Sequence, residues 1–166
     1  SNDETYYYEF FPSNKLELGL WLESERMLHP VIDEIGVKTQ NEVVKEEKRL
    51  SYDNRPYGQL LPQITQSLFK KHPYRWLPIG SMDHLDSATL DEFIAYNKKF
   101  YVPNNAVLVV AGNFEIDETK NKIKDYFGPI PRGNDVPRID IEEDPLTAEI
   151  RKSFYDPNIQ LPMGLV

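Results

Sequence analysis

The sequence predicts an α+β fold in which helices outnumber strands. Residues 5–11 are rich in aromatic side chains and end at Pro12, which is typical of a strand. Residues 106–111 form a short, unbroken apolar run, which is typical of a buried strand. A third candidate strand covers residues 146–155. The other signals are helical, because at three positions an Asn or Thr is followed three residues later by Glu, as in a capping box.

The predicted helices follow one another along the chain. They run from Asn14 to Pro30, from Thr39 to Leu50, over 57–69, from Thr89 to about Tyr101, and over 116–127. The capping boxes open the first, second and fourth of them. The last helix is closed by Gly128 and Pro129. Residues 70–86 contain two prolines and a glycine and are predicted as a loop.

The predicted domain organisation is a single partial domain over residues 1–166. Residues 1–128 form its α+β core, residues 129–145 are a connector rich in proline and acidic side chains, and residues 146–166 begin further strands. The chain starts directly in a candidate strand and stops within an apolar run. We therefore expect it to be a piece of a longer protein, truncated at both ends.

Composition excludes several classes of function. Hydrophobic residues make up 40% of the 166 positions and charged residues 28%, which is the composition of a globular domain. The formal net charge of −8 disfavours a nucleic-acid partner, because phosphate binding requires an excess of Lys and Arg. The longest apolar run is far shorter than the ~20 residues that span a bilayer, so we expect no membrane span. The absence of Cys excludes thiolate zinc ligands and a cysteine nucleophile.

One carboxylate stands out on the helix predicted from Thr39. In a helical projection, Glu47 falls on the apolar side, between Val43, Val44 and Leu50, and Gln40 lies on the same face two turns earlier. A carboxylate on a buried apolar face must be protonated, paired with a cation or bound to a metal. The residues alone leave two interpretations open, an intramolecular salt bridge and a metal ligand.

The other candidate sites are weaker. His29, His72 and His84 do not share a helix at the spacing of a zinc site, and we interpret them as surface or loop residues. The chain has no glycine-rich phosphate loop and no Gly-x-Ser-x-Gly elbow. A basic cluster with two neighbouring aromatic residues is interpreted as solvated loop rather than as a nucleic-acid site. This cluster consists of Lys70, Lys71, His72 and Arg75, with Tyr74 and Trp76.

Nine stretches in unbroken order resemble one family, the insulinase/pitrilysin zinc peptidases and their relatives in mitochondrial presequence processing. The resemblance extends from about Asp3 to Pro131 and is closest to the short bacterial members. The stretches are 3–9 (DETYYYE), 12–14 (PSN), 18–27 (LGLWLESERM), 42–49 (EVVKEEKR), 53–58 (DNRPYG), 72–74 (HPY), 79–85 (IGSMDHL), 100–112 (FYVPNNAVLVVAG) and 126–131 (YFGPIP).

The resemblance implies a Zn²⁺ site built from two segments. A His-x-x-Glu-His helix supplies two ligands and the general base, and a later Val-Val-x-Glu-Glu segment supplies the third ligand. In this chain the third ligand is Glu47, and Gln40 stands where many members have a supporting acid. The His-x-x-Glu-His motif is absent, and we expect it upstream of Ser1. No catalytic residue is therefore expected within this chain, which alone should neither cleave peptides nor hold zinc tightly.

The resemblance also implies a fold and a function. The fold is a two-layer mixed β-sheet with helices packed on it. The function of the longer protein is zinc-dependent endoproteolysis of peptides or unfolded polypeptides, which bind as an added strand at the sheet edge. A homologous second half or a partner subunit would complete the enzyme. The alternative is a non-catalytic homologue that serves as scaffold or substrate-binding subunit for a peptidase.

Overall fold

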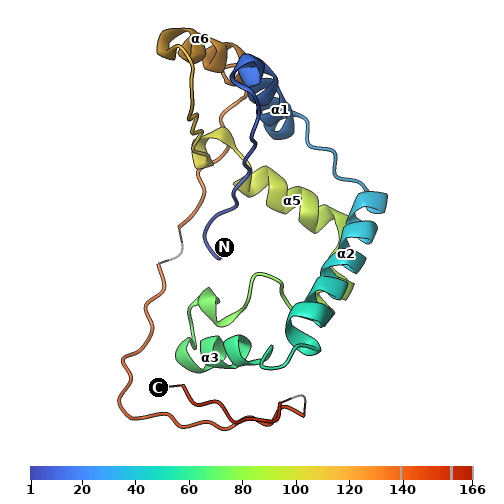
Figure 1. The fold of residues 1–166 in the computed structure, drawn as a ribbon, viewed down its shortest axis with the longest axis vertical. Helices are drawn as coiled ribbons and strands as arrows, with labels where there is room; N and C mark the ends of the chain where they lie inside the picture. The colour runs from blue at the N-terminus through green and yellow to red at the C-terminus, as the bar shows by residue number, and fades with distance from the viewer. Residues whose placement is uncertain (139, 158, 166) are drawn as a thin grey trace. The chain divides into compact units, whose positions relative to one another are not determined.

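The structure is a computed structural model that describes residues 1–138, 140–157 and 159–165 (Figure 1). Its regular elements over these ranges are all helical. The α-helices are α1 (Leu16–Leu28), α2 (Glu34–Lys48), α3 (Leu60–Leu68), α4 (Met82–Ser87), α5 (Leu90–Phe100) and α6 (Ile116–Phe127). Three short 3₁₀ helices, η1 (Ser13–Lys15), η3 (Pro73–Arg75) and η4 (Pro103–Asn105), and one π-helix, η2 (Arg49–Asp53), lie between them.

The predicted α+β class, with its two-layer mixed sheet, is wrong for this structure. The described residues contain no strand, including those of the segments 5–11, 106–111 and 146–155. Val107 and Val109 are 91% and 78% exposed, whereas their segment was predicted to be buried. A strand exists only when a partner accepts and donates its backbone hydrogen bonds. An apolar pattern predicts which residues favour a strand, but it does not supply that partner.

The chain divides into two compact units. The first comprises residues 1–4, 38–88 and 139–166, and the second comprises residues 5–37 and 89–138. Helix α2 begins in the second unit and continues in the first. None of the described helices is long and apolar enough to cross a membrane.

Helices α1 and α6 form the best-packed part of the second unit. Leu20 on α1 is only 3% exposed. At Gly19, an added Cβ would lie 2.4 Å from Cε1 of Phe11, so this position lets the aromatic ring lie directly against the helix. The Tyr126 hydroxyl of α6 donates to Oε1 of Glu17 on α1 at 2.9 Å. The Phe11 ring thus packs on α1, and the Tyr126 hydrogen bond links α1 to α6.

Two helix predictions are confirmed and two capping predictions are wrong. The capping box at Thr89 forms in both directions with Glu92, and α6 covers residues 116–127 as predicted. The box at Asn14 does not form, because α1 begins at Leu16 without a side-chain cap. Helix α2 starts at Glu34 rather than near Thr39, because the Asp33 carboxylate accepts from the Gly36 N–H at 2.6 Å. The segment 70–86, predicted as loop, contains η3 and the start of α4.

The C-terminal end of α2 is fastened by polar contacts in the first unit. The helix continues directly into the π-helix η2, whose closing hydrogen bond joins the Asn54 N–H to the Arg49 carbonyl at 2.8 Å. The Lys48 ammonium lies 2.8 Å from Oδ1 of Asp53, and the Gln59 amide also donates to that oxygen. Such π-turns are often found at functional sites. Here the π-turn begins two residues after Glu47.

Candidate functional site

Glu47 lies near the end of α2 on a face that is open to solvent. Its side chain is exposed, and its apolar neighbours Val43 and Leu50 are 54% and 63% exposed. The prediction that this face is buried is therefore wrong in the present structure. Val43 lies on α2 and Leu50 lies in the adjoining η2, so the apolar side chains that the helical spacing grouped around Glu47 remain largely in solvent.

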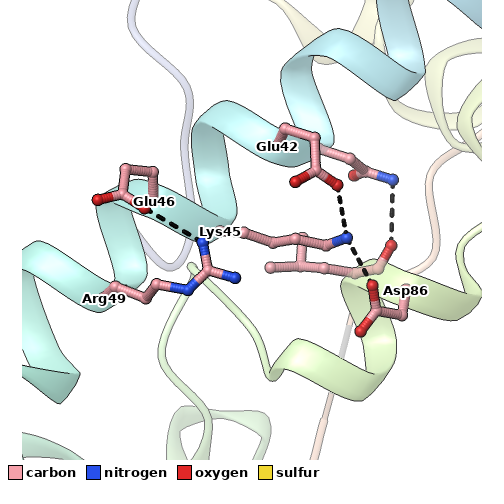
Figure 2. A network of polar contacts seen from close by, with 7 residues as sticks. Glu42, Lys45, Glu46, Arg49 and Asp86 are labelled. Atoms are coloured by element: carbon pink, nitrogen blue, oxygen red, sulfur yellow. Dashed lines mark hydrogen bonds and ion pairs between the residues drawn. The ribbon is translucent and has the colours of Figure 1, made fainter.

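The other acidic side chains around Glu47 are engaged in ion pairs. The Lys45 ammonium lies 2.8 Å from Oε1 of Glu42 and 2.5 Å from Oδ1 of Asp86 (Figure 2). The hydrogen bonds with Asp86 and then Glu42 raise the pKa of Lys45 above its ordinary value. The Arg49 guanidinium lies 3.1 Å from Oε2 of Glu46 (Figure 2). Neither Glu42 nor Glu46 is thus a free ligand.

Glu47 differs from these two carboxylates. Among the described residues it has no hydrogen-bond or ion-pair partner, and the same holds for Gln40, which is also exposed. A carboxylate without a competing cation is available to an external ligand. Position and availability therefore distinguish Glu47 from Glu42 and Glu46, although burial does not.

The described residues do not fit a zinc ion on their own. No group of three or more His, Asp or Glu side chains in the part of the chain that the structure describes is arranged to hold a metal. His29 is paired with Glu25, with Nδ1 and Oε2 2.8 Å apart. His72 accepts a hydrogen bond at Nδ1 from the Tyr74 N–H at 3.2 Å. A single carboxylate lacks the three protein ligands of a catalytic zinc site.

The basic cluster that the sequence singled out is occupied by contacts within the first unit. The Lys70 ammonium donates to the Gln66 carbonyl at 2.8 Å, and the Arg75 guanidinium donates to the Lys70 carbonyl at 3.0 Å. Lys71 pairs with Asp144 at 2.6 Å. Sequence reasoning missed the role of Glu143, whose carboxylate accepts from backbone N–H groups of this cluster. The acidic composition of residues 129–145 was the signal that could have suggested it.

Comparison with known proteins gives one consistent class, the zinc proteases. The chain is 31% identical over 127 residues to "Zinc protease PqqE" of Helicobacter pylori, covering 76% of this chain and 29% of that protein. It is 27% identical over 128 residues to an "uncharacterized zinc protease" of Mycobacterium leprae, covering 77% and 28%. A crystal structure of a protease from Helicobacter pylori superposes with a TM-score of 0.72 at 28% identity, covering 76% of this chain and 31% of that one.

Residues 87–161 match the family described as "Peptidase M16 inactive domain". This match and the relatives named zinc proteases support membership of the insulinase-like peptidase family, M16, which the sequence stretches also resemble. It spans about 29% of the length of the curated relatives that it matches first.

The comparisons bear on Glu47 in two ways. The match to the inactive domain begins at residue 87, so Glu47 lies before it. The alignment with the Helicobacter pylori zinc protease is long enough to include Glu47 wherever it begins in the chain. The segment that carries Glu47 is therefore aligned with a protein named as a zinc protease, whereas residues 87–161 are of the inactive-domain type.

Proposed function

We propose that this chain is a segment of a zinc metalloendopeptidase of the M16 family and that it contributes one zinc ligand, Glu47. The observation that carries the proposal is the alignment, across Glu47, with proteins named zinc proteases. The structure supports the choice of residue, because Glu42 and Glu46 are neutralised by Lys45 and Arg49 and Glu47 is not.

Each residue near the site would have a distinct task in the longer protein. Glu47 would offer a free carboxylate oxygen, and Gln40 would offer a hydrogen-bonding amide two turns earlier on α2. Lys45 would keep Glu42 and Asp86 away from the ion by holding both carboxylates. When bound, zinc would supply a polarised water for attack on a peptide carbonyl. The remaining ligands and the general base would come from residues outside this chain.

The proposed substrates are peptides or unfolded polypeptides, and the proposed partner is a homologous second half or subunit. The 166-residue chain alone should not hydrolyse peptides, because one carboxylate without imidazole ligands makes a weak metal site.

The test is zinc content and peptide hydrolysis in the longer protein that includes this chain. Glu47→Gln should lose bound zinc and activity, because the amide is a poorer ligand. Glu46→Gln, a matched change on the adjacent residue, should keep both. Zinc lost with Glu46→Gln but retained with Glu47→Gln would contradict the assignment, as would peptide hydrolysis by the 166-residue chain alone that a chelator abolishes.

A second candidate is a non-catalytic subunit that acts as scaffold or binds substrate for a peptidase. The match of residues 87–161 to an inactive domain favours it. The same metal analysis separates the two candidates, because a non-catalytic subunit would hold no zinc in the unmodified longer protein and would lose nothing in the Glu47→Gln variant.

A further inference from the structure

The bend between α3 and η3 gathers three backbone donors around one carboxylate. The Lys70 N–H donates to both oxygens of Glu143 at 3.0 Å, and the N–H groups of Lys71 and His72 donate to Oε1 at 2.7 and 2.5 Å. All three donors precede the first residue of η3, so they belong to the bend and not to a helix. Consecutive N–H groups that converge in this way form an anion-binding nest.

The neighbouring ion pair extends the contact to a second acidic residue. The Lys71 ammonium lies 2.6 Å from Oδ1 of Asp144, the residue that follows Glu143. The bend thus holds two adjacent carboxylates by different means, the first by backbone dipoles and the second by a side-chain charge. The hydrogen bonds from His72, Lys70 and Lys71 hold the pKa of Glu143 below its ordinary value, as expected for a carboxylate in its charged form.

The bend is held in shape by contacts that do not involve Glu143. The Arg75 guanidinium donates to the Lys70 carbonyl, a hydrogen bond within the bend. The Lys70 ammonium donates to the Gln66 carbonyl and so links the bend to α3. The rings of His72, Phe69 and Tyr74 contact one another, and the centroid of the His72 ring lies 5.9 Å from that of Phe69 and 4.2 Å from that of Tyr74. A backbone fixed in this way keeps its donors aimed at one point, which lowers the cost of binding a ligand there.

From this geometry we propose that Lys70, Lys71 and His72 form a binding site for acidic peptide segments in which Glu is followed by Asp. The site is filled in this structure by Glu143 and Asp144 of the chain's own connector. The connector is therefore a tethered competitor that blocks the site against other acidic segments. This proposal is independent of zinc and of Glu47, and it assigns a ligand to the basic cluster that the proposed peptidase function leaves unused.

The test is peptide binding to the full 166-residue chain. The probe is a fluorescent peptide with the sequence of residues 141–145, Ile-Glu-Glu-Asp-Pro, measured by anisotropy. A tethered ligand competes at an effective concentration on the order of millimolar, so removal of its carboxylate by Glu143→Gln should tighten peptide binding by about tenfold or more. Glu142→Gln is the matched control, because Glu142 has no partner among the described residues, and it should bind as the unmodified chain does.

Two further measurements make the result decisive. In the Glu143→Gln background, Lys71→Gln should weaken peptide binding, because the partner of the Asp carboxylate is lost. In the unmodified chain, hydrogen exchange should show slowed exchange of the backbone N–H groups of Lys70, Lys71 and His72, whether or not the Glu143→Gln variant folds. Equal peptide binding by the unmodified chain and Glu143→Gln would overturn the proposal, as would rapid exchange at all three N–H groups.

Discussion

Helices α1 and α2 are similar in length and are held in different ways. Three residues of α1, Gly19, Leu20 and Ser24, are buried, whereas none of α2 is. On α1 the Leu20 side chain is buried, and the Phe11 ring packs against the backbone at Gly19. Helix α2 is fixed by a capping carboxylate at its start and by ion pairs near its end. Both helices carry exposed apolar residues, but only α1 also has buried ones. Apolar side chains in the sequence of a helix are therefore not sufficient to place that helix in a core.

The largest effect is expected in α1, for Leu20→Ala. Removal of a 3% exposed leucine side chain leaves a cavity and should lower the free energy of unfolding by about 2–4 kcal/mol. Denaturant melts followed by circular dichroism measure it. Leu18→Ala on the same helix is the control, since Leu18 is 55% exposed and should cost much less. Equal losses for the two variants would mean that α1 has no packed side.

An intermediate effect is expected at the start of α5, for Thr89→Ala. The Thr89 hydroxyl accepts from the Glu92 N–H and caps the helix, so its loss should cost about 1 kcal/mol of stability. Thr89→Ser keeps the hydroxyl and should restore most of that stability in the same melts. A serine variant as unstable as the alanine variant would show that the methyl group, and not the cap, matters.

The same capping box should give stability a dependence on acid pH. The hydrogen bond from the Thr89 backbone N–H, with that from its hydroxyl, lowers the pKa of Glu92. The folded state therefore holds the Glu92 proton less tightly than the unfolded chain does. The stabilisation is present above the ordinary glutamate pKa and is lost as pH falls through the lowered folded value. Glu92→Gln should flatten this part of the stability profile, and an unchanged profile would contradict the cap.

A smaller effect, dependent on salt, is expected on α2 for Lys45→Gln. The substitution removes the ion pairs of Lys45 with Glu42 and Asp86, which lie partly in solvent. Stability should fall slightly at low ionic strength and by less at high ionic strength, because salt screens exposed charges. Melts at two salt concentrations measure the difference. A loss that does not depend on salt would mean that the aliphatic part of Lys45 contributes by packing.

The smallest effect is expected for Glu47→Gln in the 166-residue chain. Since Glu47 is exposed and has no partner among the described residues, stability should change by less than about 0.5 kcal/mol. This outcome would contrast with the loss of zinc that we propose for the same substitution in the longer protein. A large loss in the short chain would reveal a structural role for the Glu47 carboxylate.

The sequence was most informative where the signal is local. The box at Thr89 and the helix over 116–127 depend on residues a few positions apart, and both are present. The start of α2 was missed because Asp33 and Thr39 are both good caps, and residues 34–38 are helical as well. The sequence placed Glu47 on an apolar face of α2, and the ion pairs of Glu42 and Glu46 then singled it out as the free carboxylate.

By itself, the sequence indicated the family through its resemblance, and it determined the helical periods and the residue types available for chemistry, because these two depend on composition and on short spacings along the chain. Only the tertiary structure decided that 106–111 lacks a strand partner, that Val43 and Leu50 stay in solvent, and that Glu143 meets the bend at Lys70–His72. Each of these outcomes depends on groups far apart in the chain. Strand pairing, burial and the filling of the N–H nest each require a partner segment from elsewhere in the chain. A residue pattern describes one segment and does not identify that partner.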